Sequence, residues 1–169
     1  MTTTEPPPIK PFVLTRLFEA PRESVFKAWT ERERMNQWSG PQGVAISHAT
    51  FDLRPGGMLH YCMKTPDGHE MWGKWAIRAV VAPERLVFVT SFSDATGGLT
   101  RHPMSATWPL EMLSIVTFAE EGNKTLLTIE WLPLNPTEAE RKTFDEGHES
   151  MKMGWTGMLD KLANYLKGN

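Results

Sequence analysis

The last third of the chain carries a long amphipathic pattern, which follows a run of β-like segments with no helical pattern between them. At about 100° per residue, the buried candidates of 137–166 fall within an arc of roughly 120°. These candidates are Phe144, His148, Met151, Trp155, Met158, Leu159, Leu162, Tyr165 and Leu166. Thr137, with Glu140 three places on, has the pattern of a capping box that starts a helix. We therefore expect one long helix with one buried face, around which a sheet can wrap.

Three glycines fall inside this predicted helix, namely Gly147, Gly154 and Gly157. Each costs roughly 1 kcal/mol relative to alanine in a helix interior. Gly147 and Gly154 project near one flank, where the missing side chain could let another element approach closely. The alternative is a kink without a functional role.

Composition indicates one globular domain, since 40% of the 169 residues are hydrophobic and 22% are charged. We expect this domain to span 12–169, after a polar, proline-rich lead over 1–11 that is disordered. The net charge of −2 gives no overall attraction to nucleic acid or to an anionic membrane. No segment approaches the ~18 apolar residues of a membrane span, and no signal-peptide pattern opens the chain. The sequence predicts a cytoplasmic protein with neither nucleic acid nor membrane as a partner.

The segment order predicts an α+β fold. A strand over 12–18 is followed by a helix opened at Pro21, with Val25, Ala28 and Trp29 buried, then by a charged break and a short helical turn over 35–38. Strands are expected over 44–53, 58–65, 69–81, 86–92, 111–119 and 125–132, joined by Gly- and Pro-containing turns. This gives a curved antiparallel sheet of about seven strands, with the helices on one face.

The segment over 93–109 is long, polar and glycine-bearing. A connection of this length in a compact domain indicates either a mobile lid or disorder, and the sequence leaves both open.

Several short sequence motifs occur in an order that resembles the sequences of the helix-grip superfamily. This superfamily includes START lipid-transfer domains, the birch-pollen allergen fold and polyketide cyclases. The motifs include Phe18-Glu-Ala-Pro21, Val25-Phe-Lys-Ala-Trp29, Asp52-Leu-Arg-Pro-Gly-Gly57, Pro83-Glu-Arg-Leu-Val87 and Gly154-Trp155. Within this superfamily the chain is most similar to the activator of heat-shock-protein-90 ATPase homologue group, over about 12–167. The resemblance implies a sheet wrapped around the C-terminal helix, with a cavity between them that often holds an apolar or amphipathic molecule.

Strand parity and the helical wheel together predict which side chains line such a cavity. The candidates are Trp38, Tyr61, Met63, Trp75, Phe88, Val116, Phe118, Trp131, His148, Met151, Trp155 and Met158. Flexible thioethers and flat rings suit an adaptable apolar pocket. The alternative is that the same side chains fill the core.

His148 is the only histidine on the buried arc of the predicted helix. It could anchor a ligand or transfer a proton, or it could be hydrogen-bonded to backbone or to a neighbouring carboxylate. The histidine spacing fits no metal motif, no phosphate-binding loop or nucleophile elbow occurs, and the lone Cys62 is expected to be a packing residue. We therefore predict no metal and no cofactor, and we name no catalytic residue.

Three functions remain open. The first is binding of a small hydrophobic or amphipathic ligand. The second is a metal-free enzyme of the cyclase or lyase type, for which His148 and Tyr61 are the only acid-base candidates. The third is activation of the heat-shock-protein-90 ATPase, which the group's name suggests, although no second, charged partner-binding domain is present. A chaperone partner is therefore not expected, whereas the exposed side of the sheet could support a homodimer.

Overall fold

The computed structural model describes residues 9–39, 44–102 and 105–168, in which it places eight strands and four helices. In chain order these are β1 (Phe12–Phe18), α1 (Arg22–Thr30), α2 (Arg32–Trp38), β2 (Ala45–Phe51), β3 (Met58–Lys64), β4 (Glu70–Val81), β5 (Arg85–Ser93), β6 (Leu99–Thr100), β7 (Met112–Glu121), β8 (Lys124–Pro133), α3 (Glu138–Glu146) and α4 (His148–Lys167). The Gly- and Pro-containing segment 39–43, which precedes the strand predicted over 44–53, and the predicted N-terminal lead fall mostly outside the described residues.

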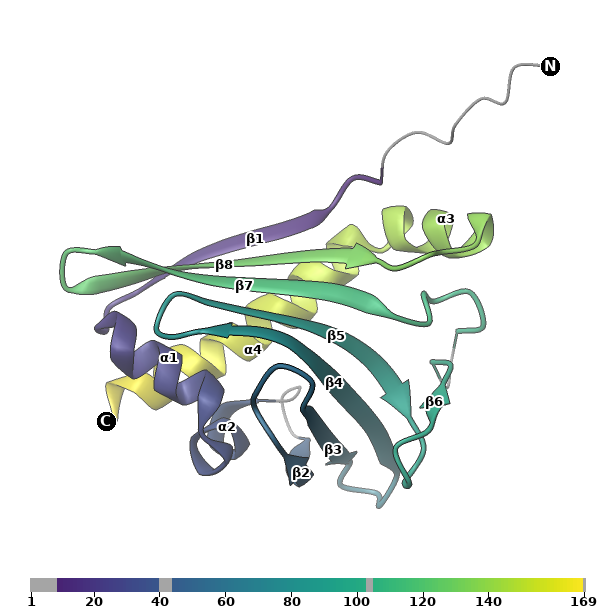
Figure 1. Cartoon of the computed structure of the whole chain (residues 1–169), viewed down its shortest axis with the longest axis horizontal. Helices are drawn as coiled ribbons and strands as arrows, with labels where there is room; N and C mark the ends of the chain where they lie inside the picture. The colour runs from purple at the N-terminus through teal and green to yellow at the C-terminus, as the bar shows by residue number, and fades with distance from the viewer. Residues whose placement is uncertain (1–8, 40–43, 103–104, 169) are drawn as a thin grey trace.

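All strand pairs are antiparallel, and the sheet has the order β1-β8-β7-β5-β4-β3-β2. Figure 1 shows the sheet bending around α4, which crosses it diagonally, while α1 and α2 lie near the C-terminal end of α4. The predicted α+β fold, with two short helices after the first strand and a long C-terminal helix gripped by the sheet, is confirmed. The additional strand is β6, whose two residues pair with the end of β5. It lies within the segment 93–109, for which the sequence predicted no strand.

The predicted single helix over 137–166 is wrong at Gly147, where the chain forms two helices. Gly147 has φ −91° and ψ 2°, and its amide donates to the carbonyl of Phe144 at 3.1 Å, one residue short of the α-helical partner. Glycine leaves the helical conformation at little steric cost, so α4 begins anew at His148. The predicted capping box is confirmed: the Glu140 amide donates to Thr137 Oγ1 at 3.1 Å, and the Thr137 amide donates to Glu140 Oε1 at 2.8 Å.

The predicted charged break after the first helix is shorter than expected, because Arg32 to Arg34 belong to α2. A single extended residue, Glu31, separates α1 from α2. The indole of Trp38 donates to the carbonyl of Ala28 at 2.9 Å, which fixes α2 against α1. The run of charged residues therefore indicated the correct position for the break between the two helices but predicted a break longer than the single residue observed.

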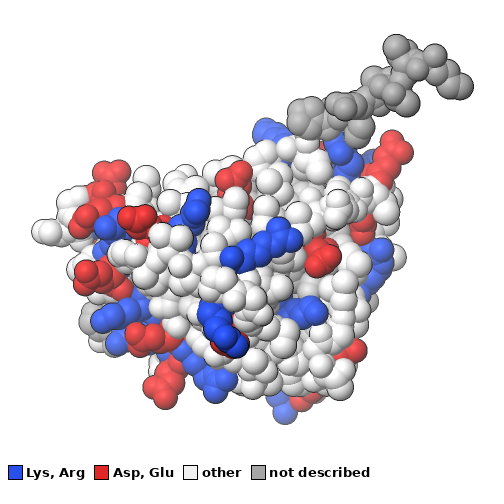
Figure 2. All heavy atoms as spheres, viewed as in Figure 1, with Lys and Arg blue, Asp and Glu red and all other residues white. Residues whose placement is uncertain are grey.

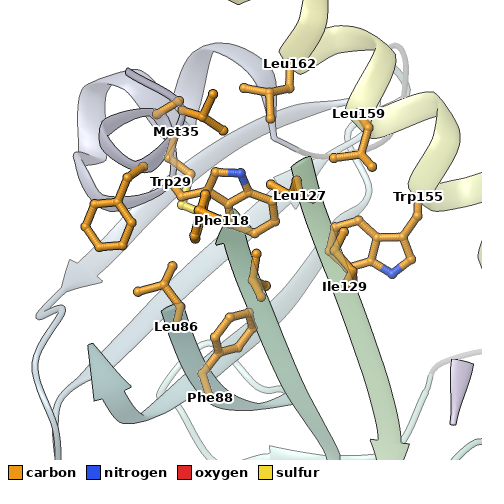
Figure 3. Close-up of a cluster of buried hydrophobic side chains, with 14 of the residues drawn as sticks. Trp29, Met35, Leu86, Phe88, Phe118, Leu127, Ile129, Trp155, Leu159 and Leu162 are labelled. Carbon is orange, nitrogen blue, oxygen red and sulfur yellow. The ribbon is translucent and has the colours of Figure 1, made fainter. Parts of the chain in front are cut away.

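The core lies between α4, α1, α2 and the concave face of the sheet. Figure 3 shows Trp155, Leu159 and Leu162 projecting from α4 toward the strands, with Trp29 and Met35 completing the cluster from α1 and α2. Side chains with almost no exposure include Trp29, Trp38, Phe88, Phe118, Leu127, Ile129, Leu159 and Leu162. Burial of these side chains between the sheet and the helices stabilises the fold.

Charged side chains of both signs are interspersed over the face of the molecule in Figure 2. Within the described ranges, no helix combines the length and apolar character needed to cross a membrane.

Candidate functional site

A cavity of about 530 Å³, partly open to solvent, is lined by residues of α4, the sheet, the end of α2 and the segment between β6 and β7. Among the described residues that line it, none is Asp, Glu, Lys or Arg. Aromatic and methionine side chains dominate the lining, as in sites that enclose apolar ligands. The sheet and helix therefore leave a large uncharged space between them rather than a fully packed interior.

Eight of the twelve predicted site residues meet at this cavity. They are Tyr61, Met63, Trp75, Phe88, Trp131, Met151, Trp155 and Met158. The structure does not bring the other four to the lining. Trp38, Val116 and Phe118 are almost completely buried in the core, where Trp38 packs against Trp29 and Phe118 against Phe26, both from α1.

His148 lies away from this cavity, at the first residue of α4. Its ring packs edge-on against Phe144 and Phe12, with centroids 4.9 and 5.8 Å away, and it borders a separate surface hollow beside Lys10 and Lys152. Its Nε2 is buried and has no hydrogen-bond partner among the described residues. The side chain thus faces the edge strand β1, because α4 starts beyond the end of the cavity.

Thirteen further residues line the cavity that were not among the predicted lining residues. They are Met35, Ser39, Ile46, His48, Thr90, Ser91, Phe92, His102, Trp108, Pro109, Met112, Ser150 and Gly154. Alternation along β2 could have placed Ile46 and His48 on the inner face. No periodic signal marks His102, Trp108 or Pro109, which come from the irregular connection to β7.

Tyr61 contributes a neutral hydroxyl to the cavity. It pairs with Gly73 across β3 and β4, and a Cβ atom at residue 73 would lie 2.6 Å from the Tyr61 Cζ and Oη atoms. Gly73 therefore lets the tyrosine ring lie across β4. Burial raises the pKa of Tyr61 to about 12, which the neighbouring Trp75 indole offsets only in part, so the phenol keeps its proton at neutral pH.

His48 lies beside Tyr61, with ring centroids 5.9 Å apart. Its Nδ1 is 2.6 Å from Asn36 Oδ1, and because a carboxamide oxygen can only accept, Nδ1 carries the proton. Burial, followed by the positive charge of Arg32, lowers the pKa of His48 from 6.5 to about 4. The ring is therefore neutral at pH 7, and its Nε2 has an acceptor lone pair.

This depressed pKa predicts a loss of stability in mild acid. Between about pH 6.5 and 4 the unfolded chain protonates His48 while the folded chain does not, so lowering the pH favours unfolding. After allowance for solvent screening of a partly exposed ring, we expect about 1 kcal/mol from this residue between pH 7 and 5. Urea unfolding at both pH values should show that His48→Gln loses less stability than the wild type. Equal losses in the two proteins would contradict the assignment.

The segment between β6 and β7 is fastened to α3 beside the cavity. Arg101 Nη1 donates to the buried Glu140 carboxylate at 2.6 Å, and the hydroxyls of Thr107 and Thr143 are 2.8 Å apart. His102 packs against Phe92 and Trp108, with centroids 4.7 and 6.2 Å away. The described residues of this segment therefore form one wall of the cavity, and α3 supports that wall.

No group of three or more His, Cys, Asp or Glu side chains in the described residues is arranged to hold a metal ion. Cys62 is buried on β3, and burial is the main cause that raises the pKa of its thiol. A thiol with a raised pKa is a weak nucleophile at neutral pH. The polar groups available at the cavity are accordingly hydroxyls, indoles and imidazoles.

A bent antiparallel sheet that grips a C-terminal helix, with a cavity between them, defines a helix-grip domain. Residues 19–167 match the sequence pattern of the protein family described as activator of Hsp90 ATPase homolog 1-like protein. The chain therefore belongs to this family. No protein with a curated description matches the chain in sequence.

Several solved bacterial structures are similar to the chain over nearly its whole length. A Mycobacterium smegmatis protein is 25% identical, with a TM-score of 0.71 over 91% of this chain and 88% of that one. An Arthrobacter aurescens protein is 23% identical, with a TM-score of 0.77 over 94% and 87%. The AHSA1 protein from Silicibacter pomeroyi is 21% identical, with a TM-score of 0.71 over 94% and 98%. For the Arthrobacter aurescens and Silicibacter pomeroyi proteins, which are 23% and 21% identical to this chain, the similarity shows a shared fold only.

Proposed function

We propose that the protein binds a small hydrophobic or amphipathic molecule in the cavity between the sheet and α4. The observation that carries this proposal is a volume of about 530 Å³ whose lining contains no charged side chain among the described residues. This volume falls within the range of about 300–1,000 Å³ that is common for small-molecule sites. Met63, Met151 and Met158 add flexible thioethers that can adapt to the shape of a ligand.

The neutral probe N-phenyl-1-naphthylamine tests the proposal directly. Four tryptophans line the cavity, namely Trp75, Trp108, Trp131 and Trp155, so an occupant should quench their fluorescence and raise the melting temperature. Absence of both effects for this probe and for a panel of apolar compounds of similar size would remove the proposal.

A large side chain introduced into the cavity from α4 should weaken this binding without unfolding the protein. Gly154 lines the cavity, and a Cβ atom built on it would have no neighbour within 4 Å. A helical side chain leans toward the residue four positions before it, which here is Ser150, another lining residue. Gly154→Phe should therefore weaken probe binding at least tenfold, while the free energy of unfolding changes by less than about 1 kcal/mol.

Gly157→Phe is the matched control, because Gly157 lies on the same helix with open space around its Cβ position but does not line the cavity. It should keep wild-type affinity in the same fluorescence titration. Equal affinity of Gly154→Phe and Gly157→Phe would place the bound probe elsewhere on the molecule.

A further inference from the structure

The His48 imidazole is held in one orientation and one tautomer at the wall of the cavity. Its ring packs edge-on against Phe51 at a centroid distance of 5.2 Å, and its Nδ1 is 2.6 Å from the Asn36 Oδ1 atom on α2. That oxygen can only accept, so Nδ1 carries the proton and Nε2 keeps its lone pair. The two nitrogens of an imidazole point in different directions, so Nε2 is directed away from Asn36. His48 therefore presents a fixed acceptor.

The Nε2 atom of His48 is open to contact. Within 9–39, 44–102 and 105–168 it has no hydrogen-bond partner, yet it is not one of the fully buried side-chain atoms that lack a partner. The Nε2 of His148 and the Nε1 of Trp131 do belong to that buried group, so a ligand cannot reach them. His48 is half-buried and lines the cavity from β2. A molecule in the cavity can therefore contact its accepting nitrogen.

Tyr61 adds a donor on the adjacent strand. His48 and Tyr61 are paired across β2 and β3, both line the cavity, and their ring centroids are 5.9 Å apart. Burial keeps the phenol of Tyr61 protonated at neutral pH, so its hydroxyl can donate. An acceptor and a donor thus lie side by side on the β2–β3 wall.

This pair restricts the chemistry of a ligand more than the other polar groups of the lining do. Serine and threonine hydroxyls rotate and can serve either a donor or an acceptor, whereas an imidazole nitrogen with a fixed lone pair contacts only a donor. A charged ligand group would leave water without a counter-charge, since none of the described lining residues is Asp, Glu, Lys or Arg. The wall therefore matches a neutral group that both donates and accepts.

Building on the ligand binding proposed above, we propose that the ligand is an uncharged, largely apolar molecule with a hydroxyl group, which donates to His48 Nε2 and accepts from the Tyr61 hydroxyl. The apolar remainder of the ligand occupies the space lined by Trp75, Trp155 and Met158. The β2–β3 wall thereby sets the orientation of the ligand, and the surrounding rings and thioether supply the contact area.

Two naphthalenes of nearly identical shape test this inference, because 2-naphthol carries a hydroxyl where 2-methylnaphthalene carries a methyl group. Displacement of N-phenyl-1-naphthylamine at pH 7.5 gives the Kd of each compound. The quantity of interest is the Kd of 2-methylnaphthalene divided by that of 2-naphthol. Its change between wild type and variant isolates the hydrogen bond, because the hydration of the free compounds cancels.

His48→Phe keeps a flat ring but removes both nitrogens, and it should lower this ratio about fivefold, as the loss of one hydrogen bond predicts. Tyr61→Phe removes only the hydroxyl and should lower the ratio at least about twofold. His102→Phe is the matched control, since it makes the same exchange at the other lining histidine among the described residues. It should change both affinities alike and leave the ratio as in the wild type.

The wild-type protein gives a second readout that does not depend on how well a variant folds. In long-range ¹H–¹⁵N spectra, the resonance of His48 Nε2 should shift when 2-naphthol is added and stay nearly unchanged with 2-methylnaphthalene. The Nδ1 resonance should remain that of a protonated nitrogen, because Asn36 holds the tautomer.

The outcomes separate this inference from the proposed function. A ratio that His48→Phe leaves unchanged, a ratio that His102→Phe lowers equally, or an Nε2 signal that responds alike to both compounds would overturn the inference while the bound probe keeps cavity binding intact. An unchanged ratio in Tyr61→Phe alone would overturn the role of Tyr61. Naphthalenes that fail to displace a bound probe would also overturn the inference, and failure of the probe and both naphthalenes to bind would remove the proposed function with it.

Discussion

Trp29→Ala is expected to lower the free energy of unfolding by about 3–5 kcal/mol, which is the usual cost of deleting a buried aromatic ring. Trp29 is 0% exposed and lies at the junction of three helices and the sheet. Its ring centroid is 4.9 Å from that of Trp38, 6.2 Å from Trp155 and 6.1 Å from Phe118. Its loss would leave a cavity that these rings cannot all move to fill. Urea denaturation followed by circular dichroism measures the change.

Met153→Ala provides the control, because Met153 is 75% exposed on α4 and packs against no part of the core. Its free energy of unfolding should stay within about 0.5 kcal/mol of the wild type. A loss of less than 2 kcal/mol for Trp29→Ala would show that the junction can repack and that the grip on α4 does not depend on this residue.

Gly57→Ala is the second large effect, with an expected destabilisation of about 3 kcal/mol. The turn before β3 is docked on β4, since the Ile77 amide donates to the Gly57 carbonyl and the Gly56 amide donates to the Ile77 carbonyl, both at 2.9 Å. A Cβ atom at residue 57 would lie 2.2 Å from the Asp52 carbonyl oxygen. Because this neighbour is backbone, the turn itself must shift. Thermal and urea unfolding measure the loss.

The adjacent glycine is a matched comparison for this position. Gly56 has φ +84° but open space around its Cβ position. Gly56→Ala should therefore cost only the left-handed backbone conformation, about 1–2 kcal/mol. If Gly56→Ala proves as damaging as Gly57→Ala, close approach to Asp52 is not what requires glycine at residue 57.

The elements that could be predicted are those whose signal is local. The capping box at Thr137 and Glu140 marks the start of α3 within one residue, because the cap depends on four consecutive backbone positions. The alternation of apolar and polar residues over 125–132 indicates that Leu127, Ile129 and Trp131 share one face, and both Leu127 and Ile129 are 0% exposed. Gly147 was recognised as a weak point of the predicted helix, but propensity alone does not decide between a strained helix and two helices.

The candidate site was predicted less completely than the fold. Inward parity grouped Tyr61, Met63 and Trp75, which line the cavity, but it could not distinguish side chains that face open volume from those that face another element. Phe118 points inward and meets Phe26 of α1, so it belongs to the core. His148 lies on the buried arc of the helix, yet its neighbour is the edge strand, since a helical wheel gives a face but no position along the axis.

By itself the sequence determined the α+β class, the place of the C-terminal helix and the inner face of most strands, because hydrophobic periodicity is a property of neighbouring residues. Only the tertiary structure decided that a cavity remains and that residues of the β6–β7 segment form one of its walls. A cavity is the volume left when elements distant in sequence reach their packing distances, so it depends on sheet curvature and on all these contacts together.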